Sequence, residues 1–266
     1  MNTGNNIFSK RLMMLALVAV GLILSESISA NKGLEIAQLS DKNNEGFVDS
    51  QSLLEMQLIN RRGNVVIRKM KSKRLEVSGD GDKSLMVFES PRDVKGVAIL
   101  SFSHKTSSDD QWLYLPALKR VKRIASKNKS GPFLGSEFTF EDLSSQEIEK
   151  YSYRFLRDED LNGKPNHVIE RIPLDPNSGY TKHIVWIDKE NYLVQKVDYY
   201  DRKSFHLKTG TFSDYKKYVN RIWQASSIEM VNHQNKKKTV LIFREIAYST
   251  GLSEKDFSQN SLKRSR

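Results

Sequence analysis

Side chains that commonly perform catalysis or bind metal ions are sparse in this sequence and stand far apart. The acidic runs Asp109–Asp110 and Asp158–Asp160 lie among polar turn residues, where we expect carboxylates to be solvated. The chain has neither a Gly-x-Ser-x-Gly motif nor a Walker or Rossmann glycine pattern. There is no cysteine, and no two histidines are spaced as a ligand pair. These observations predict no enzyme activity, no cofactor and no metal site. The histidines are His104, His167, His183, His206 and His233.

A dense basic run is the next candidate for chemistry, with Lys119, Arg120, Lys122 and Arg123 inside five residues. In a strand these cations divide between both faces, so we expect the segment at a rim or sheet edge. Two roles remain open for this basic rim. The charges would deter pairing with another strand, or they would meet anionic headgroups or an acidic partner. A further candidate for such a surface is the run 236–238, which is three lysines.

A long β-hairpin is predicted between residues 53 and 70, because apolar and polar residues alternate on both sides of the turn signal at 61–64. Arg68 is a cation between two apolar residues of one strand face. It either faces a ligand, holding a headgroup or pinning a covering helix, or it lies on the solvent side while Val65 and Ile67 point inward. Leu54, Met56 and Leu58 share one face of the first strand. Val66, Arg68 and Met70 share one face of the second strand.

Short strands dominate the rest of the chain. They recur from residue 151 to residue 246 with turn signals such as Asn162–Gly163 between them, which predicts an antiparallel sandwich or barrel. A short amphipathic helix is expected at Lys32–Lys42.

Phe257 and Leu262 are expected to anchor a polar tail without helical pattern. No Gly/Ser/Pro-rich linker divides the chain, so residues 31–266 should form one domain.

Residues 1–30 have the pattern of a cleaved secretory signal. Lys10 and Arg11 precede the apolar run Leu12–Leu24, which is too short to span a bilayer comfortably, and Ala30 marks a small-residue cleavage site. An uncleaved membrane anchor is the alternative. Because the chain has no cysteine to carry a lipid anchor, we expect an exported, non-lipidated protein in the periplasm of a Gram-negative bacterium.

The charge balance is strongly basic, with 43 Lys and Arg against 32 Asp and Glu. Loss of residues 1–30 would remove two cations and one anion. A basic balance often indicates nucleic acid, but an exported protein rarely meets it, so no nucleic-acid partner is expected. Anionic lipid headgroups or an acidic partner suit the compartment, and solubility alone is the simplest explanation.

The stretch from Trp112 to Leu143 has a pattern that predicts β-structure, because Phe138 and Phe140 alternate with polar residues. The same stretch carries a family resemblance. Its segments W-L-Y-L-P-A-L, K-R-I and F-L-G-S-E-F-T-F-E-D-L resemble the signature of outer-membrane lipoprotein-sorting proteins, the LolA-like periplasmic carriers, with mild departures at Glu137 and Phe140. The resemblance extends from about Gly46 to Leu262. It implies a mainly β fold, with a curved antiparallel sheet forming a half-open LolA/LolB-like barrel under a few short helices. It also implies no catalysis and an association with RND-type exporters.

The function expected from these observations is that of a lipid or lipoprotein carrier. Each buried CH₂ group is worth about 0.8 kcal/mol, so an acyl chain is costly to leave in water. The carrier would be a monomer, and its partners would be an RND-type exporter of the inner membrane or an outer-membrane acceptor. The alternative is an interaction module without cargo that docks through its basic surface, and an enzyme acting on lipid or glycan is a third possibility. The expected lining of the hollow is Leu54, Met56, Leu58, Arg68, Met70, Met86, Phe88, Trp112, Tyr114, Phe138 and Phe140.

Overall fold

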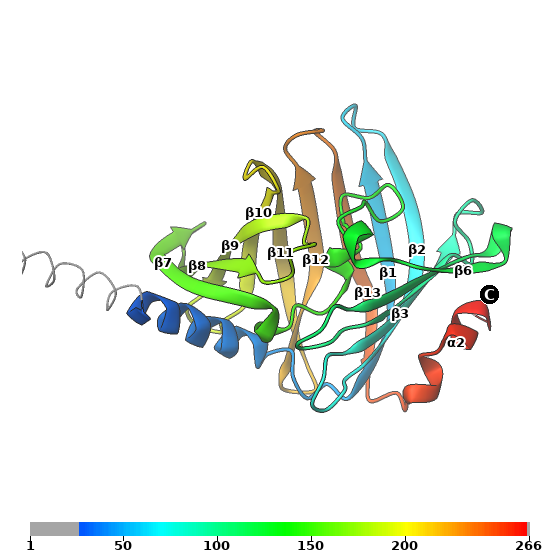
Figure 1. Ribbon diagram of the computed structural model, residues 1–266, viewed down its shortest axis with the longest axis horizontal. Coiled ribbons are helices and arrows are strands. Elements are labelled where there is room, and N and C mark those ends of the chain that lie inside the picture. The colour runs from blue at the N-terminus through cyan, green and yellow to red at the C-terminus, as the bar shows by residue number, and fades with distance from the viewer. Residues whose placement is uncertain (1–26, 265–266) are drawn as a thin grey trace, which may run out of the picture.

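One antiparallel sheet of thirteen strands makes up most of the protein in this computed structural model, which describes residues 27–264 (Figure 1). Its strands are neighbours in the order β6-β5-β4-β3-β2-β1-β13-β12-β11-β10-β9-β8-β7. The edge strands β6 and β7 do not pair with each other, so the curved sheet stays a half-open barrel, as predicted. The elements are β1 (Asp49–Ile59), β2 (Val65–Leu75), β3 (Lys83–Ser90), β4 (Ala98–Phe102), β5 (Asp110–Leu115), β6 (Arg120–Arg123), β7 (Tyr151–Leu161), β8 (Lys164–Pro173), β9 (Tyr180–Asp188), β10 (Val194–Asp201), β11 (His206–Tyr218), β12 (Ile222–Asn232), β13 (Lys238–Tyr248) and α2 (Gln259–Arg264).

Side-chain alternation gives the sheet two faces. We call the face that carries Met56 and Met70 the inner face, and both of these side chains are almost completely buried there. The apolar cluster on this face extends from Leu113 on β5 to Ile169 on β8. Burying each of these aliphatic or aromatic side chains contributes about 1.5–3 kcal/mol, so this cluster is the main core.

The outer face of β3 to β6 has a second cluster, and it corrects one prediction. Leu113 points inward, so its strand neighbours Trp112 and Tyr114 point outward, away from the hollow they were expected to line. Phe257 and Leu262 are buried in the same outer cluster, which confirms them as anchors. The tail was expected without helix, but residues 259–264 form α2, which covers this face.

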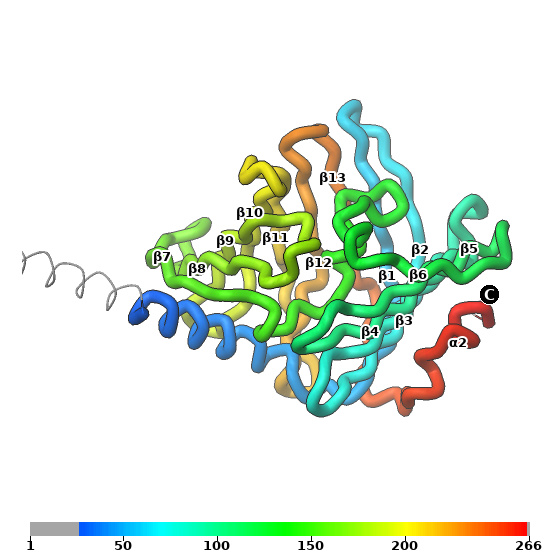
Figure 2. Tube along the Cα trace, in the orientation of Figure 1, coloured from blue at the N-terminus to red at the C-terminus, as the bar shows by residue number. Residues whose placement is uncertain are grey.

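A helix covers the β7 end of the inner face and includes residues 27–41 (Figure 2). Ile36 and Ala37 enter the inner cluster from it. Gly33 is required at the contact with β7, because a Cβ there would lie 2.6 Å from the backbone nitrogen of Phe155. The expected helix is therefore present and covers one end of the sheet.

This helix is longer than predicted, since the expected range began at Lys32. The basic region and apolar run of the predicted signal peptide belong to residues 1–26, which lie outside the described residues. Residues 27–30, also assigned to that peptide, lie in the helix. Within the described part of the chain, no helix is both long and apolar enough to cross a membrane.

Candidate functional site

A covering loop, residues 129–143, lies over the inner face and closes on itself. At its neck, the Glu141 amide donates to the Lys129 carbonyl at 2.9 Å, and the Phe140 amide donates to the Gly131 carbonyl at 3.2 Å. The loop is therefore a compact flap with adjacent ends rather than a passing segment.

The sequence predicted β-structure within this loop, and the structure corrects that prediction. Pro132 and Thr139 form an isolated bridge in place of a strand ladder. Gly135 has a φ of 79°, which reverses the backbone before a strand can extend. Phe138 and Phe140 still share the inner cluster, as their alternation predicted, although no strand presents them.

Aromatic side chains of the covering loop fill the hollow. Phe133 is fully buried, and its ring centroid lies 5.7 Å from that of Phe88 and 5.6 Å from that of Phe140. The predicted lining residues that meet in this cluster are Leu54, Leu58, Met56, Met70, Met86, Phe88, Phe138 and Phe140. The protein's own loop thus occupies the apolar surface that an acyl chain would need.

Arg68 ties the covering loop to β2. Its Nη1 donates to the Leu134 carbonyl at 2.7 Å, while its Nε is buried without a hydrogen-bond partner. Burial lowers the pKa of the guanidinium, and the Asp93 charge works in the opposite direction. Val65 and Ile67 are about half exposed. Arg68 therefore faces inward, and the alternative with these two residues inside is wrong.

Glu137 anchors the tip of the covering loop to β12 and β13. Its amide donates to Thr239 Oγ1 at 3.0 Å. Its Oε2 accepts hydrogen bonds from Asn232 at 2.7 Å and from Asn235 at 3.0 Å. The loop tip is thus attached beside the β12–β13 turn.

A buried ion pair holds the covering loop next to its neck, on the side of β9 to β11. Lys208 on β11 is 1% exposed, and its Nζ lies 2.5 Å from Asp142 Oδ2 and 2.9 Å from the Glu137 carbonyl. Tyr180 donates to Asp142 Oδ1 at 2.8 Å. The ammonium also lies 5.3 Å and 5.1 Å from the ring centroids of Tyr180 and Tyr199, within cation–π range. We call Lys208, Asp142 and Tyr180 the latch.

His183 packs against the latch and stays neutral. It is 1% exposed, its Nδ1 accepts from Arg171 Nε at 2.9 Å, and its ring lies 4.9 Å from that of Tyr180. Burial lowers its pKa well below the usual value, and the charges of Arg171 and Lys208 add to the effect. Burial likewise raises the pKa of Tyr180. The Nε2 atom of His183 has no partner, so the imidazole is held by packing and by one hydrogen bond.

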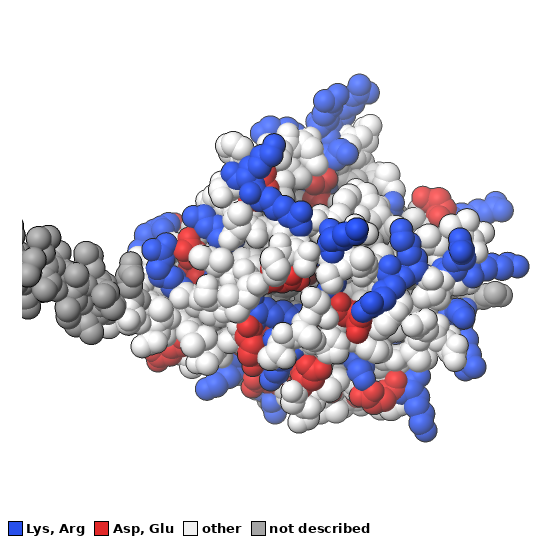
Figure 3. Space-filling view, viewed as in Figure 1, with Lys and Arg blue, Asp and Glu red and all other residues white. Residues whose placement is uncertain are grey.

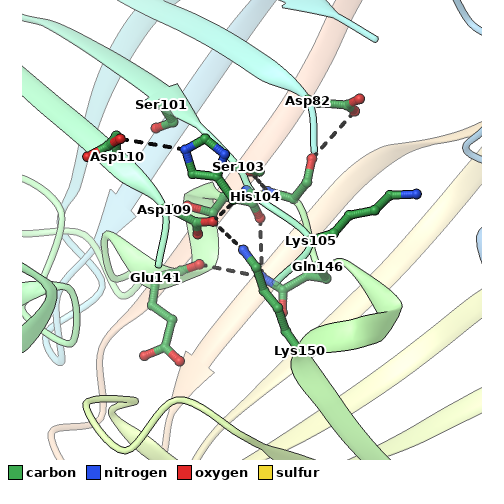
Figure 4. A network of polar contacts seen from close by, with 12 residues as sticks. Asp82, Ser101, Ser103, His104, Lys105, Asp109, Asp110, Glu141, Gln146 and Lys150 are labelled. Carbon is green, nitrogen blue, oxygen red and sulfur yellow. Dashed lines mark hydrogen bonds and ion pairs between the residues drawn. The ribbon is translucent and has the colours of Figure 1, made fainter. Parts of the chain in front are cut away.

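The neck of the covering loop adjoins a polar network on the β4–β5 loop (Figure 4). Asp109, expected to be solvated, is instead 10% exposed and pairs with Lys150. The His104 amide also donates to Asp109 at 3.1 Å, and His104 Nε2 lies 3.5 Å from Asp110. Cations thus neutralise these carboxylates, which gives the network a structural role. Among residues 27–264, no three His, Asp or Glu side chains are placed to share a metal ion.

The basic rim lies apart from the hollow. Lys119 follows a short 3-10 turn with a φ of 47°, and the other three cations lie exposed on β6. β6 is an edge strand, which confirms the predicted location. Arg123 pairs with Asp110, so part of this charge is already neutralised within the fold.

Sequence reasoning missed the latch. Lys208 is 66 residues from Asp142 in the chain, so no local motif joins them. The sequence did contain one signal, because Lys208 alternates with Gly210 and Phe212 and so lies on the same face of a predicted strand. The same signal, a cation on an apolar face, had identified Arg68.

A half-open antiparallel sheet with an apolar inner face under a loop and a helix defines a fold of the LolA type. Its solved relatives include a domain from Vibrio parahaemolyticus provisionally named as an outer membrane lipoprotein-sorting protein. That domain is 55% identical, with a TM-score of 0.87 over 88% of this chain and 100% of its own. A protein of the DUF1329 family from Desulfovibrio piger is 28% identical, with a TM-score of 0.83 over 88% and 99%. The chain belongs to this lipoprotein-sorting, LolA-like family.

Two further comparisons are consistent with this assignment. A LolA superfamily protein from Nitrosomonas europaea is 17% identical, with a TM-score of 0.70 over 88% of this chain and 99% of its own, which shows a shared fold. A family profile described only as an uncharacterized protein matches residues 80–264. A search of curated proteins finds no significant match.

Proposed function

We propose that this protein is a periplasmic carrier that holds an acyl chain of a lipid or lipoprotein on the inner face of its sheet. The observation that carries the proposal is the filling of the hollow by Phe133 and Phe138 from a flap-like loop. Apolar contacts of this kind are exchangeable, because an acyl chain offers the same contacts to Phe88 and Met70. The residues expected to touch the chain are those of the inner cluster, with Arg68 near its headgroup.

The energetics support a loop that gives way to a lipid. Burial of about sixteen methylene groups would contribute on the order of 13 kcal/mol. The cost is the exposure of the loop aromatics, each worth about 1.5–3 kcal/mol, and the loss of the Arg68–Leu134 hydrogen bond, worth about 1.5–3 kcal/mol for a charged donor. The gain exceeds these costs, so loading is favourable for a long acyl chain.

The proposal includes location and partners. Residues 1–30 would act as the export signal and be removed, leaving a single domain. Lipoprotein-sorting relatives suggest an outer-membrane acceptor, and an RND-type exporter of the inner membrane is a second partner class. A module without cargo that docks through its basic surface is the competing function, since the hollow is filled by the protein itself.

Extraction of the purified protein with organic solvent, followed by mass spectrometry, tests the proposal. A carrier should release lipid in near-stoichiometric amounts, or take up a fluorescent fatty acid when stripped. The test variant is Met56→Glu, which places a charge on the inner face. The matched control is Thr211→Glu, at an exposed position on β11. Uptake should fall for the first variant and persist for the second. Absence of both released lipid and probe uptake in the unmodified protein would favour the module without cargo.

A further inference from the structure

The turn between β1 and β2 projects beyond its neighbour and exposes apolar side chains. β2 pairs with β3 only from Lys69 onward, so within the described chain its first residues have no strand partner on that side. Val65, Val66 and Ile67 are 50%, 50% and 49% exposed. Because neighbouring side chains alternate in direction, both faces of this strand tip are apolar.

The same turn is ordered and basic. Asn60 Oδ1 accepts hydrogen bonds from the amides of Arg62 at 2.8 Å and Asn64 at 3.1 Å. This arrangement fixes the turn and leaves Arg61 and Arg62 exposed beside the apolar residues. Two guanidinium groups therefore flank a two-sided apolar tip.

Two more hairpin turns lie at this end of the sheet. Ile59 pairs with Lys238, which brings the β12–β13 turn beside the β1–β2 turn. Lys208 pairs with Asn232, which brings the β10–β11 turn to the same end. Figure 2 shows the three turns along one margin of the molecule. We call the exposed parts of these turns the hairpin-tip surface.

Cations dominate the hairpin-tip surface, and Lys and Arg side chains gather over this end in Figure 3. Two acidic residues adjoin the three turns: Asp201, at the end of β10, accepts from Gln234 at 2.8 Å, and Glu137 accepts from Asn235 at 3.0 Å. No ion pair neutralises the cations among the described residues. They are Arg61, Arg62, Arg202, Lys203, Lys236 and Lys237.

Apolar exposure and an open pocket accompany this charge. Phe205 at the β10–β11 turn is 63% exposed. A shallow pocket of about 750 Å³ opens beside it, with Arg202, Lys203 and the acidic Asp201 in its lining. This combination of cations, an exposed ring and open space suits a phosphate-bearing headgroup.

We propose that the hairpin-tip surface docks on an anionic lipid bilayer. A flat protein partner would cover one face of the β2 tip, whereas the headgroup layer surrounds a two-sided tip and buries both faces. The six cations have no ion pair among the described residues and match anionic lipid, at about 1 kcal/mol each, although Arg202 also donates to the carbonyls of Ser178 and Asn177. The unpaired edge of β2 limits the depth, because backbone groups without partners are costly in the hydrocarbon core. Docking would place Glu137, at the tip of the covering loop, next to the membrane.

Sedimentation with vesicles tests the proposal at low salt. The purified protein should bind vesicles of phosphatidylcholine with phosphatidylglycerol and bind phosphatidylcholine alone only weakly. Arg61→Gln with Arg62→Gln should weaken binding roughly 10- to 30-fold, from about fivefold for each charge. The matched control is Lys216→Gln with Lys217→Gln, near the β11–β12 turn at the other end of the sheet, and it should bind within about twofold of the unmodified protein.

A site-specific probe separates docking by the apolar tip from general charge attraction. The chain has no cysteine, so Val66→Cys and Val219→Cys each accept a single environment-sensitive dye. These valines are 50% and 58% exposed, and Val219 lies in the β11–β12 turn. Emission should shift to the blue on anionic vesicles only for position 66.

Three results would overturn the proposal: absence of vesicle binding, equal losses in the charge variant and its control, or equal dye shifts at both positions. Binding of an acidic protein at Arg61 and Arg62 without vesicle binding would also overturn it and assign the surface to a protein partner. The lipid that organic solvent extracts from the same variants is measured in a separate experiment. Membrane docking can therefore fail while the carrier function stands, and the reverse also holds.

Discussion

Two parts of the covering loop are held by opposite chemistry. We call the part around Phe133 its apolar end and the part around Asp142 its polar end. Over β1 to β3, Phe133 packs on Phe88, and Arg68 supplies a polar tie to a backbone carbonyl. Over β9 to β11, the buried ion pair of Lys208 and Asp142 holds the loop within a setting of tyrosine rings. An acyl chain can replace aromatic contacts, but it cannot replace an ion pair.

This difference suggests which end of the loop moves. Displacement of Phe133 exchanges one apolar contact for another, whereas displacement of Asp142 leaves a buried ammonium without its partner, which costs about 3–5 kcal/mol. We therefore expect the loop to open at the Phe133 end and to remain hinged at the latch.

Removal of the latch cation should have the largest effect on folding. Lys208→Met leaves the Asp142 carboxylate buried and unpaired, so the free energy of unfolding should fall by about 3–5 kcal/mol in denaturant titrations. Lys216→Met, an exposed position on the same strand, should change it by less than about 0.5 kcal/mol. The double variant Lys208→Met with Asp142→Leu should recover part of the loss. A loss under about 1 kcal/mol for Lys208→Met would contradict the hinge.

Arg68→Leu should act on cargo rather than on folding. The variant loses the hydrogen bond to the Leu134 carbonyl, but it also removes a buried Nε that has no partner, so stability should change by about 1 kcal/mol or less. The released loop end should exchange a fluorescent fatty acid roughly tenfold faster. Arg68→Lys, which keeps the charge, provides the comparison. Unchanged lipid content and exchange rate would remove Arg68 from the gating of the hollow.

The apolar end of the site could be read from the sequence because it lies on a local hairpin. Alternation on β1 and β2 is a property of neighbouring residues, so Met56, Arg68 and Met70 were assigned to one face. Trp112 and Tyr114 were assigned to the wrong face, because β5 is apolar on both sides. The cover that Phe257 and Leu262 give to the outer face explains that pattern.

The polar end could not be read in the same way. Lys208 and Asp142 meet only after β9 to β11 have assembled and the covering loop has folded back. The loop itself was mistaken for β-structure because Phe138 and Phe140 alternate, and two residues cannot distinguish a strand from a turn that buries both rings. Long-range pairing, rather than local preference, sets the geometry of the latch.

Mild acid should loosen the polar end before the apolar end. The folded-state pKa of His183 lies well below its usual value, so neutral His183 contributes stability above about pH 6.5, and this contribution is lost as the pH falls below that value. The slope cannot exceed about 1.4 kcal/mol per pH unit for one group. At the apolar end, Arg68 stays charged across this range. Burial raises the pKa of Asp41 to about 6 and that of Glu147 to about 7, and both carboxyls lie near Asp82 before β3, where their protonation favours the folded state toward acid.

Hydrogen exchange with mass spectrometry, corrected for intrinsic rates, can compare the two ends between about pH 7.5 and pH 5.5. Protection of peptides from β9 and β11 should fall more than that of peptides from β1 and β2. Burial raises the pKa of Glu141, which stabilises the folded state toward acid and opposes the effect of His183. The His183→Gln variant isolates the histidine, because its substitution leaves Glu141 in place. If the unmodified protein and the variant lose protection equally, His183 does not set the difference between the two ends, and acid sensitivity at the latch must come from another group.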